Sequence, residues 1–339
     1  MVSGSAPQKA VETLSRFLSN VRHHPRYKEQ VIDMSNREAI KNVAWQLDGP
    51  LSGWKGYLNR QAGYAHSANA MVAVHKAAAA RGVKFLIGKD RGGHITELVY
   101  TNDKATGVRS ATGQTHPAAL TIVAAGAAAA TLVPSAADQI IAKSWSLGHV
   151  QLTDEETSIL RGVPVTYARD LGFFFEPDPV TKLLKICPMG GGYVNTDPTT
   201  GKSLPPRTLR ESDDVLPAED EGRIRRLLRE TLPRLGLADR PLVEKKLCWF
   251  ADTRDSEFVV DYVPGSQGSV VLCSGDSGHL FKMLPIAGGW VQKLLEEDRQ
   301  STARWRWKDV RGGKWEGDVS WRVGQTGEFA DVKKAKAKL

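Results

Sequence analysis

The stretch SVVLCSGDSGHLFKMLP, from Ser269 to Pro285, constrains the fold of this chain more than any other. Its apolar first half predicts a buried strand, and a helix is expected from His279 onward. Gly275 and Gly278 lie between the two elements and allow the backbone to approach a ligand closely. Amides at the start of a helix favour negatively charged groups. The pattern therefore predicts an anion-binding turn within a domain of mixed α/β type.

The rest of the sequence extends this prediction to an α/β (α+β) fold with two parts. An alanine-rich helix that Ser67 can cap leads into a short buried strand at Val83–Ile87. The continuous apolar run Ala119–Ala127 is typical of a central strand that is buried on both faces. From Ser144 onward, short strands separated by turn residues predict an antiparallel sheet. Glu221–Leu237 predicts an amphipathic helix.

Length and charge exclude several classes of protein. The 339 residues are enough for two domains, and no apolar run reaches the roughly 18 residues of a membrane span. The net charge of +8 comes partly from Arg223–Arg229 and from the last eight residues, but these basic stretches lack the aromatic residues of a nucleic-acid interface. Met1–Ala10 does not resemble a secretory signal. The cysteines lack the spacing of metal ligands, so we expect no metal site and a reducing compartment; they are Cys187, Cys248 and Cys273.

Four segments together carry a family resemblance: GWKGYLNRQAGYAHSANAM, LTIVAAGA, LCWFADTRDSEFVVDY and SGDSGHLFKMLP. They resemble the FAD-dependent amine oxidases of the D-amino-acid-oxidase superfamily, namely the fructosyl-amino-acid oxidases (amadoriases) and the sarcosine, pipecolate and saccharopine oxidases. The resemblance covers roughly Trp54 to Lys282. It implies FAD as cofactor and the oxidation of a secondary amine of an amino acid to an imine. Oxygen would be the acceptor, and hydrogen peroxide would be released.

The resemblance gives two residues a role beside the flavin ring. It implies that Cys248 forms a covalent thioether to the ring, and Lys245 and Lys246 would favour the thiolate that this requires. It also implies that Lys185, in LLKIC, is a catalytic residue that promotes the reaction with oxygen, because a cation stabilises superoxide. Without the resemblance, Cys248 would be interpreted as a small core residue and Lys185 as an exposed strand lysine.

The opening stretch then faces the pyrimidine side of the flavin by resemblance. Lys282 would bind the substrate carboxylate and act as the second catalytic residue, and Lys55 is a weaker candidate for the same carboxylate. The cofactor-binding set implied by the resemblance is Cys248, Gly126, Gly275, Asp276, Ser277, Gly278, His279 and Lys282.

Two departures from the family pattern limit the prediction. The strand–GxGxxG–helix unit that binds the FAD pyrophosphate is absent from the sequence. The alternative to an active oxidase is therefore a truncated, inactive paralogue that does not bind FAD. Pro188 and Met189 stand where amadoriases carry an acidic pair that reads the sugar. This argues against fructosyl amino acids and favours an N-alkyl amino acid, saccharopine, pipecolate or sarcosine type of substrate.

The expected domain organisation follows from these elements. We predict an incomplete FAD-binding, Rossmann-like domain over residues 51–143 and 266–298, with its N-terminal βαβ unit missing, and an antiparallel-sheet substrate domain over residues 1–50 and 144–265. Residues 299–339 form a C-terminal extension that ends in Ala337-Lys338-Leu339, which matches a peroxisomal address. We expect a monomer in the peroxisome, or otherwise in the cytoplasm. Its partners would be an amino-acid substrate, oxygen and the peroxisomal import receptor, with no nucleic acid or membrane.

Overall fold

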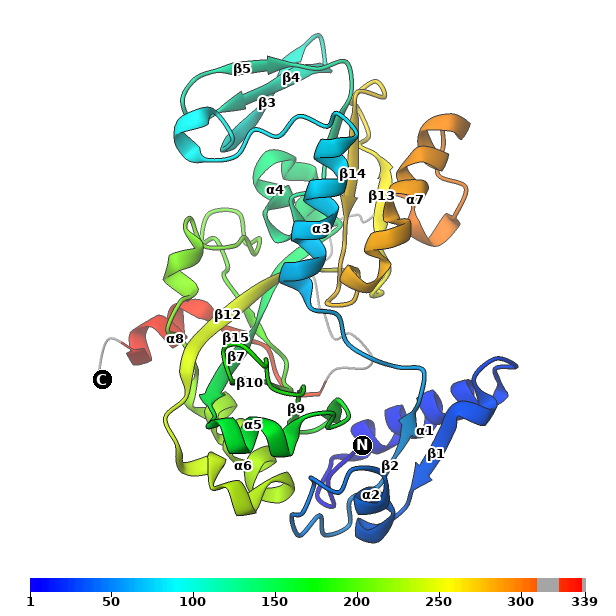
Figure 1. The fold of residues 1–339 in the computed structure, drawn as a ribbon. Coiled ribbons are helices and arrows are strands. Elements are labelled where there is room, and N and C mark those ends of the chain that lie inside the picture. Colours follow the sequence, from blue (N-terminus) through cyan, green and yellow to red (C-terminus); the bar gives the residue numbers. More distant parts are fainter. Residues whose placement is uncertain (310–322, 337–339) are drawn as a thin grey trace.

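The computed structural model describes residues 1–309 and 323–336, which form the three parts visible in Figure 1. An N-terminal unit lies beside a large sheet, and a second group of strands and helices lies above them. Within the described ranges, no helix is long and apolar enough to cross a membrane. Short 3-10 helices connect the main elements at Lys28–Gln30, Lys89–Arg91, Gly126–Ala128, Pro134–Asp138, Leu209–Ser212, Pro233–Leu235, Leu237–Asp239, Phe281–Met283 and Ala303–Trp305.

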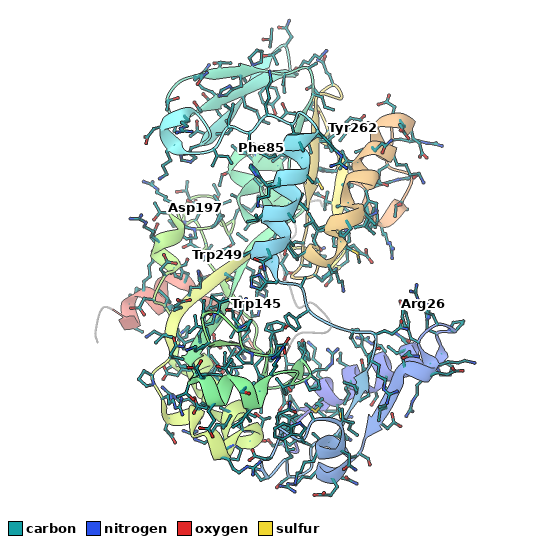
Figure 2. All side chains as sticks on the ribbon, in the orientation of Figure 1. Arg26, Phe85, Trp145, Asp197, Trp249 and Tyr262 are labelled. Atoms are coloured by element: carbon teal, nitrogen blue, oxygen red, sulfur yellow. The ribbon has the colours of Figure 1, made fainter. Side chains whose placement is uncertain are left out.

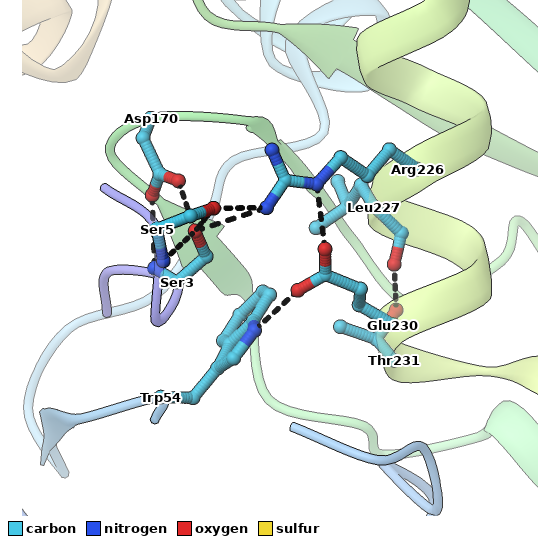
Figure 3. A network of polar contacts seen from close by, with 8 residues as sticks. All are labelled: Ser3, Ser5, Trp54, Asp170, Arg226, Leu227, Glu230 and Thr231. Carbon is cyan, nitrogen blue, oxygen red and sulfur yellow. Dashed lines mark hydrogen bonds and ion pairs between the residues drawn. The ribbon is translucent and has the colours of Figure 1, made fainter. Parts of the chain in front are cut away.

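The N-terminal unit consists of two helices and a two-stranded antiparallel sheet. Its elements are α1 (Gln8–His23), β1 (Val31–Met34), α2 (Arg37–Val43) and β2 (Gly56–Asn59). Buried Trp54 donates from Nε1 to the Glu230 carboxylate at 2.6 Å, and Arg226 donates to the other oxygen of that carboxylate, also at 2.6 Å. Arg226 also donates to the hydroxyl of Ser5 at 2.5 Å. This network, shown in Figure 3, fixes the N-terminal unit against helix α6 (Ala218–Thr231).

The large sheet has the strand order β15-β11-β7-β10-β9-β8, and β12 also pairs with β7. All of its pairs are antiparallel except β11–β15. Its strands are β7 (Ile141–Gln151), β8 (Thr166–Ala168), β9 (Gly172–Phe174), β10 (Leu183–Pro188), β11 (Tyr193–Val194), β12 (Val243–Asp252) and β15 (Gly327–Glu328). The prediction of an antiparallel sheet after Ser144 is thus confirmed, with one parallel pair at its edge.

Helix α6 covers one face of this sheet. Its residues Ile224, Leu227 and Leu228 are fully buried and pack with Leu184 and Ile186 of β10 in one hydrophobic cluster. The predicted amphipathic helix is confirmed, but it ends at Thr231 rather than Leu237, because Pro233 cannot continue it. Helix α5 (Asp154–Leu160) begins with a capping box, and α8 (Phe329–Lys336) packs on the sheet through buried residues.

The upper part holds two three-stranded sheets and three helices. One sheet has the order β3-β4-β5 and is antiparallel, whereas the other has the order β13-β14-β6 with β14 and β6 parallel. The elements are α3 (Ser67–Ala80), β3 (Ile95–Thr101), β4 (Lys104–Ser110), β5 (Thr115–Pro117), β6 (Thr121–Val123), α4 (Ala129–Leu132), β13 (Val259–Tyr262), β14 (Val270–Ser274) and α7 (Leu284–Glu297).

Three local predictions are wrong. Val83–Ile87 follows α3 but forms no strand, and Ile87 is 64% exposed, because no described strand offers backbone partners to this segment. Within Ala119–Ala127 only the three residues of β6 are a strand, and they lie at the edge of their sheet, with Ile122 44% exposed. The helix expected from His279 begins only at Leu284, because the amides of His279 and Leu280 donate to the Asp276 carbonyl oxygen in a turn and Phe281–Met283 form a 3-10 helix.

The predicted domain division remains a prediction. Strand β2 pairs with β1, and β13 pairs with β14, so two sheets cross the expected boundaries at residues 51 and 265. The segment Ala337–Leu339 lies outside the described residues.

Candidate functional site

The face of the large sheet opposite α6 brings together several chemically active side chains. In the register of the sheet, Lys185 of β10 lies opposite His149 of β7, and Cys248 of β12 lies opposite Trp145 of β7. Directly opposite residues point to the same side, and so do residues separated by an even number along a strand. These four residues and Cys187 therefore share one face, which we call the open face. Trp145 is labelled in Figure 2.

Burial decides the protonation of Cys248. The pKa of its thiol is raised because burial outweighs the nearby positive charges of Lys185 and Lys246. Lys245 contributes differently, since its ammonium lies 3.4 Å from the Asp214 carboxylate. The prediction that neighbouring lysines favour the thiolate is therefore confirmed for Lys246, but not for Lys245, and burial has the larger effect. Burial raises the pKa of Cys187 further, to about 12.

His149 is a member of the open face that sequence reasoning missed. Its pKa is lowered, first by burial, while Lys185 also acts to lower it. Its Nδ1 lies 3.3 Å from the Glu244 carbonyl oxygen, which fits a neutral ring that donates from Nδ1. The signal was present in SWSLGHVQ, because strand alternation places Trp145 and His149 on the same side.

The SGDSG loop is tied to the end of β12. The Asp276 carboxylate accepts from the amides of Ala251 at 2.7 Å and Gly278 at 2.9 Å, and the Ser277 amide donates to the Ala251 carbonyl oxygen at 3.0 Å. Gly275 has φ +80°, and a Cβ there would lie 2.8 Å from Cγ2 of Thr253. Asp276 and Ser277, which were expected to contact the cofactor, therefore also hold the loop in place. The Gly278 amide already donates to the Asp276 carboxylate. Ala251, to which the loop is hydrogen-bonded, lies three residues beyond Cys248 along β12.

The remaining cofactor candidates lie around this loop. His279 is half-buried, with its ring centroid 5.1 Å from that of Phe258, and Lys282 is exposed in the 3-10 helix Phe281–Met283. The Gly126 carbonyl oxygen accepts from the Ser274 hydroxyl at 3.3 Å, which brings Gly126 to the end of β14. The fold therefore gathers Gly126, His279 and Lys282 around the loop.

Lys55 belongs to a different part of the molecule. It precedes β2 in the N-terminal unit, where its backbone pairs with Val2 in an isolated antiparallel bridge. Its side chain is exposed. In the described part of the chain, no hydrogen bond or ion pair joins Lys55 to the loop around Gly275.

These residues fit the ring end of a flavin. At Gly126 (φ +54°), no atom lies within 4 Å of the position of an added Cβ, so there is open space beside it, and Gly278 also has a positive φ of +76°. Cys248 offers a thiol and Lys185 a cation on the adjoining open face. Over residues 1–309 and 323–336, no group of three His, Cys, Asp or Glu is arranged to hold a metal ion.

Comparison with known proteins agrees with this assignment. The family model described as FAD dependent oxidoreductase (DAO) matches residues 4–294. L-saccharopine oxidase of Schizosaccharomyces pombe is 31% identical over 296 residues, which cover 82% of this chain and 67% of that protein.

Two solved structures from Aspergillus fumigatus share the fold. One is fructosamine oxidase (Amadoriase II), with a TM-score of 0.83, 31% identity and coverage of 96% of this chain and 75% of that chain. The other is fructosyl amine:oxygen oxidoreductase (Amadoriase I), with a TM-score of 0.79, 28% identity and coverage of 98% and 85%. The expected resemblance and the mixed α/β fold class are confirmed. The chain therefore belongs to the FAD dependent oxidoreductase (DAO) family.

Proposed function

We propose that this flavin-dependent oxidoreductase oxidises a secondary amine next to a carboxylate, with oxygen as acceptor and hydrogen peroxide as product. When bound, FAD supplies the acceptor that takes a hydride from the carbon beside the nitrogen and passes the electrons to oxygen. The resulting imine is hydrolysed by water. The observation that carries the proposal is the position of Lys185 and Cys248 on the two sides of β7, on one open face.

Cys248 is proposed as the covalent anchor of the ring. Only the thiolate of a cysteine is strongly nucleophilic, and burial disfavours this form at Cys248. We therefore assign Lys185 and Lys246 a supporting part in the attachment, because both charges act to lower the pKa of that thiol. The thiolate is needed only while the covalent bond forms, and the bond persists afterwards.

Lys185 is proposed as the oxygen-activating residue. By strand geometry, two strand spacings and four residues along β7 place the Cα atoms of Lys185 and Cys248 about 16 Å apart. Cys248 would hold the ring on the face that also carries Lys185, with β7 between the two residues. The ammonium is exposed on the open face and is available to stabilise negative charge on oxygen.

Lys282 is proposed to bind the substrate carboxylate. It is exposed, and it follows directly on the loop that hydrogen bonds attach to the end of β12. His279 lies at the same turn and is half-buried. We prefer Lys282 to Lys55 for this role because Lys55 belongs to the N-terminal unit.

The residue environment also restricts the substrate class. Met189 is buried, and the Tyr167 hydroxyl donates to its sulfur at 3.4 Å. A thioether offers only a weak acceptor to the several hydroxyls of a sugar. We therefore propose an N-alkyl amino acid of the saccharopine, pipecolate or sarcosine type, in line with the name of the S. pombe relative.

Oxygen uptake and peroxide release test the proposal directly. The purified chain is incubated with FAD, freed of unbound flavin, and assayed with saccharopine, pipecolate, sarcosine and a fructosyl amino acid. We expect turnover of one of the first three above that of the fructosyl compound. If the protein is flavin-loaded but turns over none of them, the proposal is wrong. If it retains no flavin at all, the inactive paralogue is the correct alternative.

We also propose a peroxisomal location and a monomeric state. The location rests on Ala337-Lys338-Leu339, and we expect this tripeptide to bind the import receptor. A fluorescent protein fused in front of the chain should label peroxisomes, and deletion of the tripeptide should leave the label diffuse. Light scattering of the purified protein tests the monomer.

A further inference from the structure

A cavity of about 620 Å³ lies between the N-terminal unit and the β8 edge of the large sheet. None of the residues proposed above for cofactor or carboxylate binding lines it. Its volume is within the range of small-molecule sites. Its deeper wall is apolar and includes Leu14, Met34, Ile40, Leu47, Leu58 and Val163.

Two arginines give the cavity its positive charge. Arg169 lies with its guanidinium carbon 4.3 Å from the ring centroid of Phe17 and 5.5 Å from that of Tyr167. The neighbouring carboxylate of Asp170 is engaged elsewhere, because it accepts from the amide of Ser3 at 3.0 Å and from its hydroxyl at 2.5 Å (Figure 3). Among the described residues, Arg169 forms no ion pair with a carboxylate within 4 Å.

Arg60 is the second cation and is exposed beside the end of β2. Its backbone amide donates to the Gln30 carbonyl oxygen at 2.9 Å, and this hydrogen bond holds the Arg60 backbone in the N-terminal unit. Across the ranges that the structure describes, its guanidinium also has no carboxylate partner. Two cations thus lie in the lining of one cavity without an anion that neutralises them.

Among the described residues of the lining, Glu176 is the one acid, and it is already engaged. One oxygen of Glu176 accepts from the Tyr64 hydroxyl, and the other accepts from the Gly162 amide at 2.7 Å. These hydrogen bonds lower the pKa of the Glu176 carboxyl. A ligand therefore meets two unpaired cations and one satisfied carboxylate, so an anionic group with an apolar chain is favoured.

The cavity adjoins the open face of the sheet. Tyr167 lines the cavity, and its ring stacks on Phe173 with centroids 5.4 Å apart. Phe173 lies opposite Cys187, two residues beyond Lys185 on β10. Two strand spacings and two residues along the strand place the Cα atoms of Lys185 and Tyr167 about 12 Å apart. An extended side chain can reach from the reacting amine to the cavity over this distance.

We propose that this cavity binds the far end of the amine substrate, an apolar chain that ends in a carboxylate, through Arg169 and Arg60. The inference rests on the proposed function, because it assigns the substrate of that function a second anionic group. It predicts selection for amines with two separated carboxylates over amines with an uncharged end.

Binding of a matched pair of probes tests the inference without FAD. N-(carboxypentyl)glycine and its terminal amide differ only in the charge of the far end. Calorimetry on the full chain should show the carboxylate binding about tenfold more tightly than the amide, the effect of roughly one charge-assisted hydrogen bond. In Arg169→Gln and in Arg60→Gln the preference should fall toward equality. Arg169→Lys should retain part of it.

Arg109→Gln is the matched control, because Arg109 is an exposed arginine of β4 paired with Glu97 outside the cavity. It should keep the full preference. Equal binding of the two probes to the wild type overturns the inference. The inference is also overturned if Arg169→Gln and Arg60→Gln both keep the full preference for the carboxylate probe. Thermal unfolding first shows that both variants are folded.

Calorimetry and flavin assays separate this inference from the proposed function. A FAD-loaded protein whose kcat/KM shows no preference between the probes supports the oxidase and contradicts the cavity assignment. A chain that keeps no flavin but binds the carboxylate probe through Arg169 contradicts the oxidase while supporting an anion site in the cavity.

Discussion

Replacing Lys185 with methionine should slow the reaction with oxygen far more than the reaction with substrate. The change removes one positive charge from the open face and leaves a side chain of similar length. Superoxide that forms about 4 Å from an ammonium is stabilised by about 4 kcal/mol at an effective dielectric constant of about 20. That free energy corresponds to about three powers of ten in rate.

The exposure of Lys185 sets the lower limit of this effect. If water surrounded the ammonium fully, the same pair would gain only about 1 kcal/mol, or about fivefold in rate. A ring lying across β7 would cover Lys185 and move the effect toward the larger value. His149 cannot replace the lost charge, because the shift of its pKa favours the neutral ring.

Stopped-flow absorbance separates the two half-reactions of Lys185→Met. Reduction by substrate without oxygen should change by less than about tenfold, and reoxidation by oxygen should slow by about a thousandfold. Lys182→Met is the matched control, since Lys182 directly precedes the strand of Lys185 but pairs with Asp154 at 2.8 Å. Equal losses in both half-reactions, or a reoxidation rate like that of the control, would refute the division of roles.

Three further variants test the site and its support. Cys248→Ser should lose covalent flavin, so that acid precipitation leaves a colourless pellet, and a yellow pellet would exclude Cys248 as the anchor. Gly275→Ala should lower the free energy of unfolding by about 3 kcal/mol, because φ +80° costs about 1–2 kcal/mol and the added Cβ meets Thr253; an unchanged denaturant midpoint would contradict this. Glu156→Gln should cost about 1–2 kcal/mol at neutral pH, because Glu156 accepts from Arg240 and from the α5 cap. The pKa of Glu156 is lower in the folded protein than its unfolded value near 4.5. Its contribution to the free energy of unfolding is therefore present above about pH 4.5 and is lost as the pH falls through the folded pKa. If Glu156→Gln still lowers the stability in acid, the assignment is wrong.

The sequence predicts the large sheet well because its signals are local. Alternation in LLKICP puts Leu184 and Ile186 on one face and Lys185 on the other, and in the structure both apolar residues are buried and Lys185 is exposed. The apolar side of Glu221–Leu237 supplies the helix that covers the buried face. Both features follow from the period of the hydrophobic pattern and need no knowledge of distant residues.

The failed predictions concern segments whose state depends on partners elsewhere in the chain. Val83–Ile87 is apolar enough for a buried strand, yet a strand also needs a neighbour with free backbone groups, and no described strand provides one. Likewise, Ala119–Ala127 is apolar throughout, but its neighbours decide that β6 lies at an edge. The cavity near Arg169 could not be predicted either, because it forms where residues more than a hundred positions apart meet.

Strand β12 couples the two halves of the proposed site. Cys248 lies within the strand, and three residues later Ala251 exchanges hydrogen bonds with Asp276 and Ser277 of the loop that leads to Lys282. The distance between the proposed ring anchor and the carboxylate-binding lysine therefore depends on β12 and on the hydrogen bonds that join the loop to Ala251 and Thr253 at its end. Asp276 is essential to this arrangement even if it never contacts a ligand. A substitution such as Asp276→Ala would remove the acceptor of the Ala251 and Gly278 amides and leave only the Ser277 hydrogen bonds to hold the loop, so substrate binding should weaken while covalent attachment at Cys248 persists.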